Sequence, residues 1–181
     1  MGPTARACAA CGLAGALTAG IARESHAADA CDPLYESGIK SVQTPHRVRS
    51  TTTGRGGKSA SGEAIYAGGV EYLQLGGKWT RSPTPQQDMI EAAQEKLKTH
   101  PDVCTFVGER TEGGEAVSVY KAHSKELGTD QEVRILKSSG LLEGATMTLP
   151  NGSVVETRYE YGNVTAPAVP GRPADTEGDT P

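Results

Sequence analysis

The sequence is poor in aromatic residues and has no excess of positive charge. It contains one Trp, one Phe and six Tyr among 181 residues, so its core has to be built mainly from Val, Ile, Leu and Tyr. Such a modest core, together with 23 glycines, favours an open sheet over a tightly packed sandwich. Its 18 basic residues, against 22 acidic ones, form no basic stripe, which argues against a nucleic-acid partner.

Residues that could carry catalysis or bind a metal are also scarce. There are four histidines, and none lies within a catalytic motif. No HxH, HxxxH or paired-carboxylate spacing occurs, and the acids around Gly113-Gly114 are typical of a solvated turn. We therefore expect no enzyme, no metal and no cofactor. An assembly in space of His46, Ser50 and an acid is the enzymatic alternative.

The first 27 residues have the layout of a secretory signal peptide. Arg6 precedes an apolar run, 7–22, which is followed by a polar segment and by small residues at the candidate cleavage sites. The run is short and rich in Ala and Gly for a helix that spans a membrane. We expect residues 1–27 to be a cleaved signal peptide and the rest to reach the periplasm. An uncleaved anchoring helix is the alternative.

Four cysteines divide into two pairs. Cys8 and Cys11 lie inside the predicted signal peptide, whereas Cys31 and Cys104 follow it. An oxidising compartment favours a disulfide between the two that remain after cleavage. Lipidation of Cys31 is disfavoured because the residues before it, Asp29 among them, do not match a lipoprotein signal.

The remaining chain has the length of one domain, which we place at residues 28–164. Residues 165–181 contain four prolines, several acids and one large apolar residue, Val169. They cannot bury enough apolar surface to fold, so we predict a disordered acidic tail.

Short alternating runs, separated by glycine-rich segments, predict an antiparallel sheet. The Gly76-Gly77 pair is a two-residue hairpin signal that sets Leu75 opposite Lys78. Residues 54–59 are interpreted as a loose loop. The expected strands are 46–53, 70–75, 78–81, 103–109, 115–122, 131–137, 145–149 and 154–161.

The turn at residues 150–152 decides the register of the last hairpin. A two-residue Asn-Gly turn would leave Met147 and Val155 on opposite faces. A type I turn with Gly152 as a left-handed bulge residue instead pairs Met147 with Val155 and gathers the apolar residues on one face. We favour the bulged turn.

Two helices are predicted. The longer one spans residues 85–99, with Thr84 as its cap and Gln87 completing a capping box. A shorter helix is expected at residues 33–42. The apolar stripe of the longer helix should lie against the sheet and consists of Met89, Ile90, Ala93 and Leu97.

Several segments, taken in order, resemble one family. They include the runs EYLQLGGKW at 71–79, CTFVGE at 104–109, ILKSSGL at 135–141 and RYEYGNV at 158–164. This succession is similar to the LolA-like superfamily, which includes the lipoprotein carriers LolA and LolB and LppX-type lipid-binding proteins. The resemblance implies a mainly β fold of the α+β kind: a strongly curved antiparallel sheet, an unclosed half-barrel, with one or two lid helices.

The same resemblance implies a monomeric carrier that binds a lipid, or the acyl chain of an acylated protein, in an apolar cavity beneath the helix. Apolar burial would drive such binding. An interaction module of the cell envelope, with partners docking on edge strands or through the tail, is the alternative. The residues expected to line the cavity are Leu73, Leu75, Met89, Ile90, Leu97, Val117, Val119, Val133, Ile135, Met147 and Val155.

Overall fold

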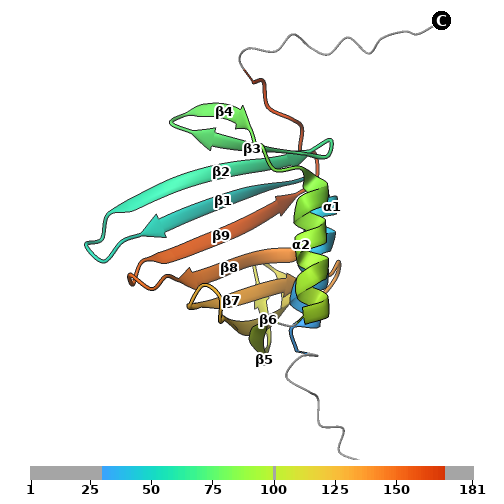
Figure 1. The fold of residues 1–181 in the computed structure, drawn as a ribbon, viewed down its shortest axis with the longest axis vertical. Helices are drawn as coiled ribbons and strands as arrows, with labels where there is room; N and C mark the ends of the chain where they lie inside the picture. The colour runs from blue at the N-terminus through green and yellow to red at the C-terminus, as the bar shows by residue number, and fades with distance from the viewer. Residues whose placement is uncertain (1–29, 100, 170–181) are drawn as a thin grey trace, which may run out of the picture.

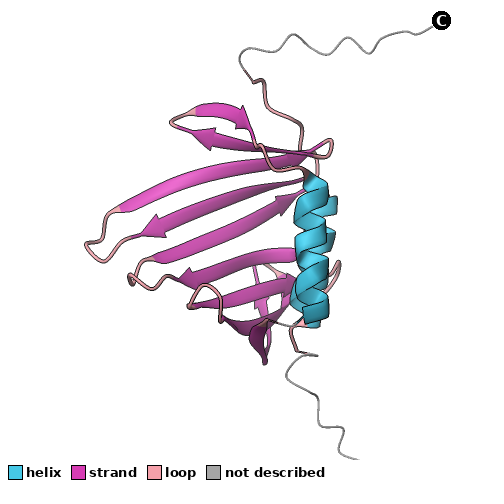
Figure 2. Cartoon of the chain, in the orientation of Figure 1, coloured by secondary structure: helices cyan, strands magenta, loops and turns pink. Residues whose placement is uncertain are grey.

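The computed structural model describes residues 30–99 and 101–169, which form nine strands and two helices (Figures 1 and 2). The predicted signal peptide and most of the predicted tail lie outside the described residues. The elements are α1 (Asp32–Gln43), β1 (His46–Thr53), β2 (Ser59–Ala67), β3 (Val70–Leu75), β4 (Lys78–Arg81), α2 (Gln86–Thr99), β5 (Asp102–Glu112), β6 (Glu115–Ser124), β7 (Thr129–Leu136), β8 (Leu142–Thr148) and β9 (Val154–Tyr161).

The strands form one antiparallel sheet in the order β4-β3-β2-β1-β9-β8-β7-β6-β5. Two meanders, β1 to β4 and β5 to β9, are joined by the pairing of β1 with β9. The sheet is not closed, because β4 and β5 are its two ends. The expected fold class, an unclosed antiparallel sheet with helices, is confirmed.

The two helices lie side by side across one end of the strands, and the other ends of β1, β2, β8 and β9 extend beyond them (Figure 1). The Gln86 side chain ties them together, since its Nε2 donates to the Val42 carbonyl at 2.6 Å. Both predicted helices are confirmed to within two residues. The predicted capping box is wrong, because α2 begins at Gln86 and the Gln87 amide donates to Glu91 Oε1.

The predicted disulfide between Cys31 and Cys104 is present, with Cα atoms 5.1 Å apart. It fixes the start of α1 to the edge strand β5. The Tyr35 hydroxyl adds a hydrogen bond to Asp102 Oδ2 at 2.9 Å. Around this disulfide the buried core consists of Cys31, Leu34, Tyr35, Cys104, Ala122, Val133 and Ile135.

Both hairpins have the predicted register. Leu75 pairs with Lys78 across the glycine turn, and Met147 pairs with Val155. Gly152 has a φ of 79°, as the bulged turn requires.

One strand was not predicted: β2, which occupies Ser59–Ala67 between β1 and β3. Its first residues are Ser, Ala and Gly, so it lacks the β-branched and aromatic content that marks a strand. Backbone pairing of residues 59–66 with β1 holds it in place instead.

Candidate functional site

The two faces of the sheet differ in chemistry. Because side chains alternate along a strand, the pairing register assigns each residue to a face. We call the face that packs on α1 and α2 the uncharged face, since β2, β1, β9, β8, β7 and β6 place no Asp, Glu, Lys or Arg on it. Its residues include Val48, Ser50, Thr52, Ala60, Gly62, Ala64, Tyr66, Val133, Ile135, Ala145, Met147, Val155, Thr157, Tyr159 and Tyr161.

At the end covered by the helices, His46 is the centre of an aromatic cluster. Its ring stacks on Tyr66 at 4.3 Å, and the rings of Tyr159 and Tyr161 lie 5.6 Å away. Burial lowers the pKa of His46 below 6.5, which favours the neutral ring. The histidine therefore adds no charge to this face at neutral pH.

A hydrogen-bonded group closes the junction between α1 and the sheet. The Tyr161 hydroxyl donates to the Leu142 carbonyl at 2.8 Å, and Ser41 Oγ accepts from the Leu142 amide at 3.0 Å. The two hydroxyls lie 2.9 Å apart. Burial, above all, raises the pKa of Tyr161 to about 12, so it stays a neutral donor.

Beyond the helices, the uncharged face continues over the far ends of the strands (Figure 2). Met147 and Val155, cross-strand partners, are half-buried there. The Ser50 and Thr157 hydroxyls bond to each other at 3.2 Å, so these polar groups are already partnered. This part of the face offers no charge to a ligand.

The opposite face, which we call the charged face, carries a network of ion pairs. Arg47 pairs with Glu63 at 2.8 Å, and Arg49 with Glu160 at 2.5 Å. Arg134 has 9% of its surface exposed and lies 2.8 Å from Glu143.

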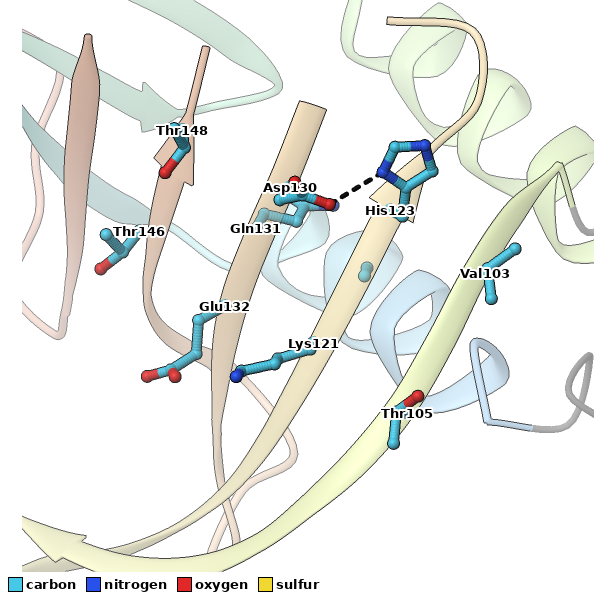
Figure 3. Close-up of a pocket in the computed structure, with 10 residues that line it drawn as sticks. Val103, Thr105, Lys121, His123, Asp130, Gln131, Glu132, Thr146 and Thr148 are labelled. Atoms are coloured by element: carbon cyan, nitrogen blue, oxygen red, sulfur yellow. Dashed lines mark hydrogen bonds and ion pairs between the residues drawn. The ribbon is translucent and has the colours of Figure 1, made fainter. Parts of the chain in front are cut away.

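A hollow of about 540 Å³ lies on the charged face near the β5 edge (Figure 3). The view shows its side chains in front of the strands, with α1 behind them. His123 Nδ1 and Asp130 Oδ1 are 2.8 Å apart within it. Eight of its ten lining residues are polar or charged, and it lies on the face away from the helices, so it is not the apolar cavity expected beneath the helix. Its lining comprises Val103, Thr105, Lys121, Ala122, His123, Asp130, Gln131, Glu132, Thr146 and Thr148.

The structure brings most of the predicted cavity residues to one face. Val133 and Ile135 are core residues that pack with α1, and each has 6% of its surface exposed. On α2, Ile90 is buried and Leu97 packs against this core, while Met89 is half-buried.

Four further predicted residues lie on the uncharged face away from this core. Leu73 and Leu75 continue this face onto β3, where it also carries Glu71, and Met147 and Val155 lie on it over β8 and β9. Leu75, at 64% exposure, is the most open of them.

Two predicted residues lie on the wrong face. Val117 pairs with Leu136 and Val119 with Arg134, whereas Tyr120 pairs with Val133. The even-numbered residues of β6 therefore face the helices, and Val117 and Val119 are buried on the charged face. Composition could not reveal this, because valines are compatible with either face of a strand.

The small residues of β2 on the uncharged face were missed by sequence reasoning. Ala60, Gly62 and Ala64 alternate regularly, but without large apolar side chains the alternation gives no hydrophobic signal. The adjacent pair Ile65-Tyr66 is the signal that could have indicated a strand.

Within residues 30–99 and 101–169, no three His, Cys, Asp or Glu side chains gather as metal ligands. In the same part of the chain, neither helix is long and apolar enough to cross a membrane. His46 and Ser50 share a face but do not meet, since four residues of extended strand separate them by about 13 Å.

No family model matches the chain, and no curated protein matches its sequence. Two solved structures of MucB bound to MucA, one from Pseudomonas aeruginosa, match 76% of this chain with TM-scores of 0.49 and 0.48 and identities of 16% and 15%. This chain spans 57% and 59% of those MucB chains.

Two further matches cover almost the whole of the solved chain. The lipoprotein LppX of Mycobacterium tuberculosis matches with a TM-score of 0.45 and 12% identity over 73% of this chain and 94% of LppX. A LolA superfamily protein from Nitrosomonas europaea matches with a TM-score of 0.30 and 8% identity over 72% of this chain and 91% of that one. At such identities the likeness concerns the fold alone.

Proposed function

We propose that this protein is a non-enzymatic binder of a hydrophobic ligand, a lipid or the acyl chain of an acylated protein, on the uncharged face beyond the helices. The observation that carries the proposal is the distribution of charge. Six strands place their Asp, Glu, Lys and Arg side chains on one face, and the helices cover only one end of the other.

An acyl chain suits such a surface because it needs no polar partner. Its binding is driven by apolar area removed from water, at roughly 25 cal/mol per Å². In this proposal Leu73, Leu75, Met147 and Val155 contact the chain. The edge of α2, with Met89, Ile90 and Leu97, bounds the site, and Val133 and Ile135 support it from the core.

The compartment is part of the proposal. The disulfide between Cys31 and Cys104 supports an oxidising environment, and the N-terminal sequence predicts export to the periplasm. An acyl chain must be shielded from water in such a compartment, which is the role proposed for this face.

The test is uptake of a fluorescent acyl probe by two variants at neighbouring positions of β8. Met147→Glu places a carboxylate on the uncharged face, and Thr148→Glu places one on the charged face. We expect Met147→Glu to weaken uptake by tenfold or more, because a ligand would bury an unpaired carboxylate. Thr148→Glu should bind as the wild type does.

Both positions lie outside the buried core, so circular dichroism should show the sheet intact in each variant. Native mass spectrometry of the protein purified from membranes adds a second readout, with co-purifying lipid expected. No uptake of any apolar probe by the wild type, together with no bound lipid, would overturn the proposal.

A further inference from the structure

The two edges of the sheet are protected to different degrees. An edge strand exposes unpaired N–H and C=O groups, which proteins normally guard with short length, charges, prolines or bulges. β4 is four residues long and carries Lys78 and Arg81 at its ends. β5 is 11 residues long, and no strand of the described chain pairs with its outer side.

Only the second half of β5 is guarded. A bulge interrupts its pairing between Phe106 and Gly108, and the residues that follow include Glu109, Arg110 and Glu112. The segment 103–107, in contrast, contains no charge and no proline. Its three large apolar side chains are well exposed: Val103 at 43%, Phe106 at 50% and Val107 at 53%.

This unguarded segment is held rigidly. The disulfide to Cys31 fixes Cys104, and the Tyr35 hydroxyl bonds to Asp102 at its start. On its inner side the segment pairs with β6. A strand that added to the outer side would therefore find its template already formed, which lowers the entropy lost on binding.

The side chains on either face of the segment define what the added strand should carry. On the uncharged face, the Phe106 ring lies 5.2 Å from the Tyr120 ring and forms an apolar platform. An apolar residue opposite Phe106 would cover it.

On the charged face, the hollow beside the segment is lined by Lys121, whose cross-strand partner on β7 is Glu132. Asp130 is paired with His123, and Glu132 with Arg110 at 2.8 Å. Lys121 forms no ion pair in the described chain, and its side chain extends toward Glu132 and away from β5. Beside Lys121, β5 places Thr105 and no acid, so an anionic group beyond β5 would be an additional partner for the ammonium group.

A glutamate on an added strand can reach Lys121. Lys121 pairs with Thr105 across β5 and β6, so a residue opposite Thr105 would lie two strand spacings away, about 10 Å. Two long side chains span that distance, and the small Thr105 does not obstruct them. Thr105 and Phe106 are consecutive, so the acid and the apolar residue would also be consecutive.

We propose that the outer side of residues 103–107 binds an extended segment of a partner protein by strand addition, and that this segment carries a Glu next to an apolar residue. A second copy of this chain is a poorer occupant. Antiparallel pairing of two such five-residue segments would bury less than the roughly 1,200 Å² expected of a stable dimer. It would also bring two Lys121 side chains together without an acid.

The probe is a labelled, end-capped peptide of sequence Thr-Val-Thr-Val-Glu-Val-Thr-Val-Thr, followed by fluorescence anisotropy. Saturable binding is expected, with slower hydrogen exchange of those β5 amides that do not bond to β6. Phe106→Lys should weaken binding at least tenfold, because a charge at the edge opposes strand addition. Leu127→Lys, at an exposed apolar position in the turn between β6 and β7, is the matched control and should leave binding unchanged.

The charge pairing is tested with a second peptide in which Gln replaces Glu. The wild type should prefer the Glu peptide by about threefold to tenfold, and Lys121→Gln should bind both equally. Absence of binding, protection at another strand, or an unchanged preference in Lys121→Gln would overturn the proposal. So would concentration-dependent dimerisation that protects β5, since a second copy would then be the occupant.

Discussion

Gly152 illustrates what a single residue decides in this fold. Its φ of 79° lies in the left-handed region, where a residue with a Cβ atom is strained. The turn sequence predicted this conformation, and with it the pairing of Met147 with Val155. The turn sequence allowed two registers of the β8–β9 hairpin, and the apolar pattern of the two strands favoured the one observed.

We predict that Gly152→Val lowers the free energy of unfolding by about 1–2 kcal/mol, because a β-branched residue is strained at positive φ. Gly62→Val is the matched control: Gly62 has no positive φ, and an added Cβ would meet no atom within 4 Å. Urea denaturation should therefore show little change for the control. Equal midpoints for both variants would mean that the backbone of the turn is not strained by a side chain.

His46 makes stability depend on pH. Burial is the main cause that lowers its pKa below 6.5, so the unfolded chain binds the proton more tightly than the folded one. The stability that depends on the neutral ring is complete above about pH 6.5 and is lost as the pH falls through the lowered value.

The free energy of unfolding should accordingly decrease between pH 7 and pH 5, with a slope of at most about 1.4 kcal/mol per pH unit from this group. His46→Phe keeps an aromatic ring in the cluster and removes the titration. Its stability should vary less over the same interval in urea titrations at each pH. An unchanged slope in the variant would assign the pH dependence to groups other than His46.

At the scale of elements, the sequence predicted those that have a strong local pattern. The helix at Gln86–Thr99 has an apolar stripe, and eight strands have apolar alternation or turn signals. β2 has neither over Ser59–Ser61, and its conformation depends on partners far along the chain. Its position between β1 and β3 is a tertiary property that no local window contains.

The disulfide joins two secondary-structure elements, and the cysteine count predicted it. Its cysteines are 73 residues apart in sequence, and it ties α1 to the edge strand. Closure of a loop of this length stabilises a fold by about 4 kcal/mol in the chain-entropy model. We expect Cys31→Ser/Cys104→Ser to lose about this amount in denaturant titrations.

Reducing agent provides the control for that prediction. It should lower the stability of the wild type to nearly that of the double variant and leave the double variant unchanged. A wild type insensitive to full reduction would show that the core around Tyr35 and Cys104 holds α1 without the covalent link.

At the scale of the whole molecule, the partition of charge between the two faces is the property on which the proposed function depends. Alternation within one strand was readable from the sequence, as in β9, where Glu156, Arg158 and Glu160 share a face. The sequence did not show which face of one strand continues which face of the next. Val117 and Val119 were therefore assigned to the wrong face. Phase depends on register and bulges, such as the shift between Arg134 and Ile135, which only the assembled sheet shows.

The charged face is tied together by Arg134 of β7, which is nearly buried and contacts side chains of β8 and β5. Its Nε lies 2.8 Å from Glu143 and 3.2 Å from Glu112, and its Nη1 donates to Thr146 at 3.3 Å. A cation shared by two half-buried carboxylates is worth more than an exposed pair, since its removal leaves both acids without their main partner.

We predict that Arg134→Met lowers the free energy of unfolding by about 2–3 kcal/mol. This is less than the loss expected for a fully buried ion pair, because the side chains of Glu143 and Glu112 are partly exposed to solvent. Arg49→Gln is the matched control on the same face. The side chains of Arg49 and Glu160 are 54% and 41% exposed, so its loss should be under about 1 kcal/mol and should vanish in 1 M NaCl. Urea titrations at low and high salt distinguish the two. If Arg134→Met is as mild and as salt-sensitive as Arg49→Gln, the charges merely cover this face, and the pairing of β7 with its neighbours rests on the backbone and on the uncharged side.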